Sequence, residues 1–155
     1  MPIVAYNYGA RKPERMTKAI RCSITAAVCI MIAGLAIFQI ATTQLLSIFD
    51  ASEEMLRIGI PALRIISISF PVAGFCIGAG TVFQALGYSI YSMINSFVRQ
   101  LVVLIPSAYL IGKITGDVTM VWYSFVIAEV FSLILSAFFF RRIYKNVIQP
   151  LKAEK

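Results

Sequence analysis

The sequence contains no histidine, and only 14% of its residues are charged. Without histidine, the Ser–His and Cys–His pairs that activate many catalytic nucleophiles cannot form. The three cysteines, Cys22, Cys29 and Cys76, lie in apolar stretches at spacings that match no metal-binding motif. We interpret them as small buried hydrophobic residues. The sequence therefore predicts no enzyme active site, no metal site and no bound cofactor.

Long apolar stretches take the place of charge. Hydrophobic residues make up 59% of the chain and the mean hydropathy is +0.84, whereas a typical globular domain is about 45–50% apolar. A membrane-spanning helix needs about 20 apolar residues, because the hydrocarbon core is about 30 Å thick. Residues 22–49 and 65–97 contain no charge at all. We predict an all-α integral membrane protein with four transmembrane helices, at about 22–41, 58–86, 90–111 and 118–140.

Polar segments divide the chain into three parts. Residues 1–21 are expected to form the end of a preceding helix followed by a basic loop, with Gly9 as a helix-ending residue. Residues 22–140 hold the four spans, and residues 141–155 form a basic tail. Asp50 or Ser52 is placed to cap the second span. Pro61 and Pro71 are both expected to kink that span, and its small residues Gly74 and Gly78 allow close approach of another helix.

The basic residues are distributed asymmetrically, and the net charge is +7. Five Lys and Arg residues precede the first span and five follow the last, whereas only Arg57 and Lys113 lie in the loops on the other side. Because Lys and Arg accumulate in cytoplasmic loops, both termini are predicted to be cytoplasmic. The clustering at the ends of apolar stretches also argues against nucleic acid as a partner.

Six polar residues fall within or near the predicted spans: Arg64, Gln84, Asn95, Arg99, Gln100 and Glu129. Arg99 lies roughly 13 Å and Glu129 roughly 16 Å from the same membrane face, at about 1.5 Å per residue. Their spans are joined by a short loop, so the two side chains are expected to pair. The pair is either a structural link or part of an ion-coupling or gating network.

The other four of these six polar residues are expected to have structural roles or to face the membrane interface or the protein interior. Arg64 lies roughly 9 Å from the opposite face, where its side chain either snorkels to the interface or faces the protein interior. Gln84, Asn95 and Gln100 are expected to form hydrogen bonds between helices rather than to bind a substrate.

Four segments resemble the multidrug and toxic compound extrusion (MATE) transporters. Pro2–Lys12, with Asn7, Tyr8, Gly9 and Ala10 at its centre, is similar to the family's entry into a cytoplasmic loop. Segments similar to the tenth, eleventh and twelfth family helices are Phe83–Gly87, Ser96–Gln100 with Pro106, and Trp122–Phe125 with Ala128 and Glu129.

The resemblance implies a transporter with twelve helices in two six-helix lobes. Such proteins reside in the plasma membrane and export hydrophobic or cationic compounds in exchange for Na+ or H+. The four spans would be the last four helices of the C-terminal lobe. The N-terminal lobe and two further helices would be missing partners, so the chain is expected to be an inactive C-terminal fragment. No ion-binding residue of the family matches a position here.

Two alternatives remain open at the level of sequence. The first is a lipid-linked oligosaccharide flippase of the same superfamily, because Arg64 and Arg99 would suit an anionic substrate. The second is a small membrane scaffold protein without transport activity, which only the chain length supports. The bilayer is a partner under each interpretation.

Overall fold

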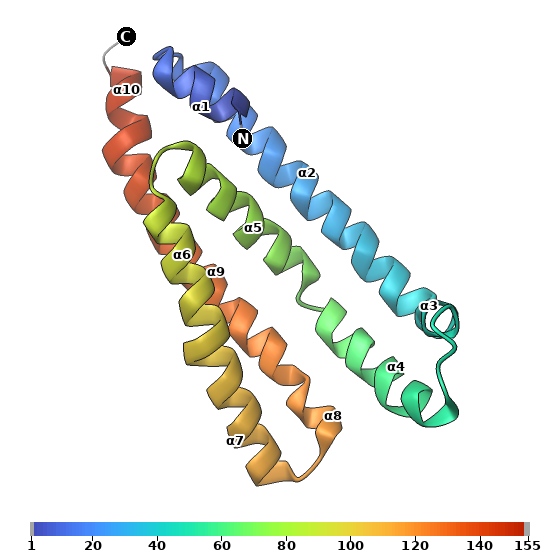
Figure 1. Ribbon diagram of the computed structural model, residues 1–155. Helices are drawn as coiled ribbons and strands as arrows, with labels where there is room; N and C mark the ends of the chain where they lie inside the picture. The colour runs from blue at the N-terminus through green and yellow to red at the C-terminus, as the bar shows by residue number, and fades with distance from the viewer. Residues whose placement is uncertain (1, 154–155) are drawn as a thin grey trace.

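A computed structural model describes residues 2–153, and every regular element among them is a helix. Figure 1 shows long helices lying side by side, with α1 and α10 at the same end of the molecule. We call this the termini end, and the opposite end the loop end. The elements are α1 (Pro2–Gly9), α2 (Pro13–Ile40), α3 (Thr42–Ser47), α4 (Glu53–Ser67), α5 (Phe70–Ala85), α6 (Ser89–Phe97), η1 (Val98–Leu104), α7 (Ile105–Thr115), α8 (Val118–Val121), α9 (Tyr123–Ile143), η2 (Tyr144–Ile148) and α10 (Gln149–Ala153).

Three continuous helical stretches are long and apolar enough to cross a membrane: Pro13–Ile40, Ser89–Thr115 and Val118–Leu151. A fourth span consists of α4 and α5 together, which are bent by 54° at their junction. The most apolar part of α2 has none of its residues buried inside the protein. The chain is therefore a multi-pass α-helical membrane protein.

The exposed face of α2 corrects one expectation about the cysteines. Cys76 of α5 is buried, as the sequence predicts, but Cys22 and Cys29 of α2 are exposed. In a soluble protein an apolar stretch must turn inward, whereas a membrane helix can direct the same residues toward lipid. Apolar surroundings in the sequence therefore did not imply burial within the protein.

The first and last spans extend beyond their apolar stretches. Proline occupies the first position of α2, where its missing N–H is not needed, so the helix begins at Pro13. Only residues 10–12 connect α1 to α2, and Arg11 adopts a positive φ of 50° in that turn. At the other end, helical structure continues through η2 and α10 over residues that the sequence analysis assigns to a tail. Long basic side chains reach the interface from within a helix, so their charge does not mark the helix end.

The second span is broken near its middle. Pro71 has no N–H for the carbonyl of Ser67, so one helical hydrogen bond is missing at the junction of α4 and α5. The hydroxyl of Ser69 donates to the carbonyl of Ile66 at 2.7 Å, and Ser67 donates to that of Arg64 at 2.9 Å. Pro61 lies inside α4, which continues past it. At the start of α4, Ser52 caps the helix by accepting from the Met55 N–H.

The third span is continuous but irregular. It consists of α6, the π-helical segment η1 and α7, and Pro106 lies in the first turn of α7. In a π-helix the backbone hydrogen bonds join residues five apart instead of four, so the α-helical hydrogen-bond pattern is interrupted. Such segments occur often at functional sites. Gly116 ends α7 in the left-handed conformation, with φ of 64°, and Asp117 caps α8.

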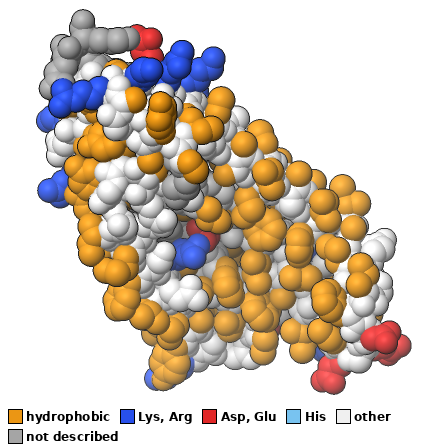
Figure 2. Space-filling model, turned by 45° about the horizontal axis from the view of Figure 1, so that its top comes forward, with side chains coloured by type: hydrophobic (Ala, Val, Ile, Leu, Met, Phe, Trp, Pro, Cys, Tyr) orange, Lys and Arg blue, Asp and Glu red, His pale blue; other side chains and the backbone are white. Residues whose placement is uncertain are grey.

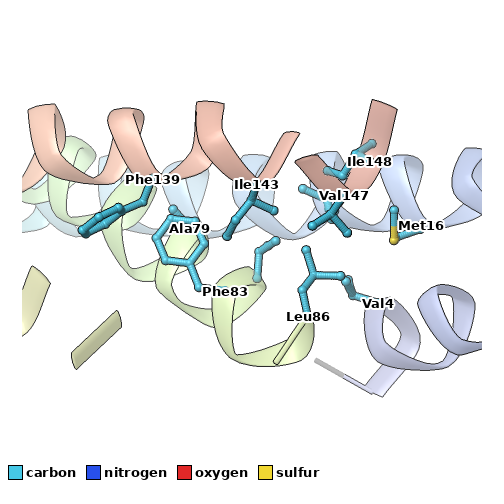
Figure 3. Packing of buried hydrophobic residues seen from close by; sticks show 11 residues of the cluster. Val4, Met16, Ala79, Phe83, Leu86, Phe139, Ile143, Val147 and Ile148 are labelled. Carbon is cyan, nitrogen blue, oxygen red and sulfur yellow. The ribbon is translucent and has the colours of Figure 1, made fainter. Parts of the chain in front are cut away.

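Hydrophobic residues pack most tightly at the termini end. Figure 3 shows Phe83 of α5 facing Phe139 and Ile143 of α9, with Val147 and Met16 alongside. Phe83 and Met16 are fully buried. The ring of Phe83 meets that of Phe139 edge-on at 6.4 Å, a favoured geometry for aromatic pairs. This cluster joins α1 and α2 at the start of the chain to the end of α5 and to the α9–η2 region.

Small residues bring α2 and α5 together. A Cβ atom at Gly74 would lie 3.0 Å from Met31 Cγ and 3.1 Å from the carbonyl oxygen of Ala27. At Gly78 it would lie 3.2 Å from Ile24 Cγ1. The two glycines, one turn apart, thus allow the close contact that the sequence analysis predicts.

The surface is polarised along the helix axes. Figure 2 shows basic side chains gathered at one end and acidic side chains at the other. Hydrophobic side chains cover most of the face between them, interrupted near the middle by a basic group beside an acidic group. This distribution fits a protein whose waist lies in lipid and whose ends lie in water.

Candidate functional site

An ion pair joins the third and fourth spans inside the apolar region. Arg99 lies on η1 and Glu129 on α9, and Arg99 Nη1 is 2.7 Å from Glu129 Oε1. The Glu129 side chain is 11% exposed and that of Arg99 is 32% exposed. The contact predicted from equal depths is present, because the two helices are antiparallel neighbours that contact each other. Each charge is held in a medium of low polarity mainly by the other.

Two further polar contacts lie on the same side of the third span. Asn95 Nδ2 donates to Ser132 Oγ at 2.9 Å, one turn from the ion pair on both helices. Gln84 Nε2 of α5 donates to Ser92 Oγ at 3.0 Å. On the third span these residues occupy positions 92, 95 and 99, which share one helix face. The ion pair and the two hydrogen bonds therefore form a polar stripe from the termini end to the middle of the protein.

Several buried polar atoms in this region have no hydrogen-bond partner among the described residues. They are Asn95 Oδ1, Glu129 Oε2, Ser124 Oγ and Ser136 Oγ. Leaving such groups unpaired is costly in an apolar medium. The second oxygen of Glu129 matters most, because a carboxylate oxygen without a donor can accept a proton or coordinate a cation. The site therefore has the chemistry to bind a small cation.

Cavities flank the ion pair on two sides, and Arg99 lines both. One has a volume of about 180 Å3 and contains the polar stripe; its walls are Cys76, Ile77, Gly80, Thr81, Gln84, Ser92, Asn95, Ser96 and Arg99. The other has a volume of about 200 Å3 and is lined by Arg99, Gln100, Leu104, Phe125, Ala128 and Glu129. Arg99 thus borders two spaces that are each large enough for several water molecules, and Glu129 borders one of them.

Arg64 and Gln100 lie apart from the polar stripe. Arg64 is exposed near the end of α4, and no described residue forms a salt bridge with it. Its carbonyl oxygen accepts a hydrogen bond from Gln39 Nε2 at 2.8 Å. Gln100 is exposed and lines the cavity of about 200 Å3. Of the six polar residues singled out in the sequence, four form the stripe and these two do not.

The Asn7–Ala10 motif comprises the last residues of α1 and the first residue of the turn into α2. Asn7 is buried, and its Nδ2 donates to the carbonyl of Ile3 at 2.8 Å while its own carbonyl accepts from the Lys12 N–H at 2.9 Å. Tyr8 and Gly9 line a surface cavity of about 420 Å3 at the termini end. The motif lies at the opposite end of α5 from the α4–α5 break and makes no contact with the ion pair.

Two features of the site were missed in the sequence. Gln39 of α2 bridges the break in the second span, donating to the Arg64 carbonyl and to Ser67 Oγ, the latter at 2.9 Å. A ladder of small residues runs along α9 through Ser124, Ser132 and Ser136, all buried. The serines are four or eight residues apart, and this spacing in the sequence indicates that they lie on one face of the helix. No sequence pattern around Gln39 indicates that it bridges the break.

The fold and the site define a polytopic membrane protein with a broken helix and an internal polar network, features found together in secondary transporters. The family model described as MatE matches residues 1–110. The chain belongs to the MatE family. No curated protein is similar enough to count as a match.

Solved structures of transporters share this fold. One is the inward-facing conformation of a multidrug resistance MATE family transporter of the MOP superfamily, with 24% identity and a TM-score of 0.85 over 98% of this chain. A second is the MATE multidrug transporter DinF-BH in complex with rhodamine 6G, with 31% identity and a TM-score of 0.82 over 95% of this chain. A third is a MOP superfamily transporter from Pyrococcus furiosus, with 26% identity and a TM-score of 0.82 over 96%.

The matches cover 34%, 32% and 33% of those three chains, respectively. This chain therefore spans about a third of the length of the transporters that it resembles. The third structure was described as having a binding pocket of reversed polarity that suggests a different function.

Proposed function

We propose that the chain is part of a secondary active efflux transporter that exports hydrophobic or cationic compounds in exchange for Na+ or H+. The observation that carries this proposal is the partly buried Arg99–Glu129 pair beside two cavities that Arg99 lines, with one carboxylate oxygen unpartnered among the described residues. An ionisable pair at this depth is costly and usually functional. The missing two thirds of a MATE transporter would supply the other lobe and the rest of the substrate cavity.

In this proposal, Glu129 binds the coupling ion in place of the Arg99 guanidinium. When H+ or Na+ reaches Glu129 Oε2, the attraction that holds Arg99 is weakened, and the guanidinium moves toward the cavity of about 180 Å3. Gln84 and Asn95 line that cavity and offer carbonyl oxygens as new acceptors. The π-helical segment that carries Arg99 supports such a shift, because its backbone ladder is already irregular.

A flippase for an anionic, lipid-linked sugar is the second candidate. Arg99 reaches the cavity of about 180 Å3, but its charge is balanced by Glu129 at 2.7 Å. The exposed Arg64 is therefore the remaining basic group for such a substrate in the middle of the described spans. We favour the cation exporter because the net charge of the paired site is zero. A scaffold without transport activity would not need the costly buried pair.

The test is to express the chain together with the complementary two thirds of DinF-BH in one membrane. Vesicles are loaded to create a Na+ or a H+ gradient, and movement of rhodamine 6G is followed by fluorescence. We expect transport only when both pieces are present, and loss of gradient dependence in Glu129→Gln. Glu53→Gln, which removes an exposed carboxylate at the loop end, is the control. Assembly of both pieces without dye movement under either gradient would contradict the proposal.

The same proposal places the protein in the plasma membrane with both termini in the cytoplasm. The basic termini end and the acidic loop end support this orientation. Alone, the chain is expected to insert but not to transport.

A further inference from the structure

A groove between the first and last spans at the termini end has no role in the proposed transport cycle. It has a volume of about 220 Å3 and runs between α2 and the junction of α9 with η2. Its α2 wall extends from Thr17 to Thr25, and the facing wall from Phe140 to Ile148. Both walls are helical, so at about 1.5 Å per residue the groove is about 12 Å long.

The chemistry of the groove changes along its length. Toward the middle of the protein, Ile24 and Phe140 make it apolar. Halfway along, Arg21 of α2 is exposed at the groove, and the facing residue at the same level is Tyr144. The buried side chains of Ile20 and Ile148 form its floor and belong to the core at the termini end. The positive charge of Arg21 is thus next to the apolar part of the groove that Ile24 and Phe140 line.

Basic residues surround the groove. Lys18, Arg141 and Lys145 are exposed, and each is adjacent in sequence to a residue that lines the groove. Within the described parts of α2 and residues 136–153, Glu14 is the only acidic residue. The local charge is therefore strongly positive at the level where a spanning protein meets lipid headgroups.

We propose that this groove binds an anionic phospholipid, with the phosphate at Arg21 and one acyl chain between Ile24 and Phe140. The charge matches a phosphate, which guanidinium groups bind strongly, and the apolar slot continues directly below it. A helix is about 10 Å wide and would lie across the groove rather than inside it. A flexible acyl chain fits a narrow apolar slot better than a helix does.

The experiment uses the full chain in bilayers that contain phosphatidylglycerol carrying a photoreactive group on its acyl chain. We expect labelling of peptides that contain Ile24 or Phe140, and little labelling with the phosphatidylcholine analogue. Arg21→Gln should weaken phosphatidylglycerol binding about fivefold, the effect of one basic residue near an anionic surface. Arg15→Gln, an equal charge change on α2 outside the groove, should have a smaller effect.

A second pair of variants tests the acyl-chain slot without changing charge. Thr25→Trp fills the groove and should abolish labelling, whereas Ser23→Trp lies on α2 outside the groove and should not. Equal losses in Arg21→Gln and Arg15→Gln would mean a diffuse surface charge and overturn the proposal. Unchanged labelling in Thr25→Trp, or competition by free glycerol phosphate, would overturn it as well. So would labelling at neither wall, the result expected if another helix covers the groove.

Discussion

Breaking the Arg99–Glu129 ion pair should destabilise the helix packing in an asymmetric way. Arg99→Gln leaves Glu129 without its partner, with a side chain only 11% exposed and no other described donor for either oxygen. Removing one partner of a buried pair costs about 3–5 kcal/mol. Glu129→Gln leaves Arg99, which is 32% exposed and borders two cavities, so its cost should be nearer 1–3 kcal/mol, roughly that of an unsatisfied polar group.

The double variant separates these costs from the strength of the pair itself. Arg99→Gln combined with Glu129→Gln removes both charges and should cost less than the sum of the two single changes, because neither charge is left without its partner. The assay is unfolding of the chain in mixed detergent micelles as the fraction of denaturing detergent rises, analysed as a double-mutant cycle. Additive effects of the single changes, or a larger cost for Glu129→Gln than for Arg99→Gln, would refute this reasoning.

Three further predictions concern packing, the broken span and orientation. Gly74→Ala should cost about 1–3 kcal/mol through overpacking against α2, whereas Gly9→Ala, which meets no atom within 4 Å, should be nearly neutral in the same unfolding assay. Gln39→Leu should cost about 1 kcal/mol and loosen the α4–α5 break, because Ser67 Oγ loses the Gln39 donor and the Arg64 carbonyl keeps only the Ser67 hydroxyl; spin labels on both sides of the break should report a broader distance distribution, and an unchanged distribution would argue against the bridge. In a background without native cysteines, a cysteine at Lys113 should react with an impermeant maleimide added outside intact cells, and protection there would reverse the predicted orientation.

Much of the polar stripe was predictable because helical rise is constant. Counting residues from a common membrane face placed Arg99 and Glu129 at similar depths, and a short loop made their helices neighbours. The partners of Asn95 and Gln84 were not predictable in the same way. Each has several hydroxyl groups within reach in principle, and only the rotation of each helix about its axis selects Ser132 and Ser92.

Irregular backbone was only partly foreseen. Pro71 indicated a kink because it lacks an N–H, yet Pro61 and Pro106 have the same chemistry and helical structure continues past both. The difference lies in the surroundings, since the break at Ser67–Phe70 is bridged by Gln39 from another helix. The π-helical segment that carries Arg99 precedes Pro106, but a proline does not by itself specify π-type turns.

The sequence by itself determined that this protein spans a membrane, roughly where its spans lie and which family it resembles. Hydrophobicity and residue count decide the first two, because a bilayer has a fixed thickness and excludes unpaired backbone groups, whereas the resemblance rests on motifs such as Asn7–Ala10. Tertiary structure alone decided which polar side chains meet, which atoms are left without partners and where cavities lie. Those properties depend on how helices pack against each other, through contacts such as Gly74 with Met31, and no local pattern encodes them.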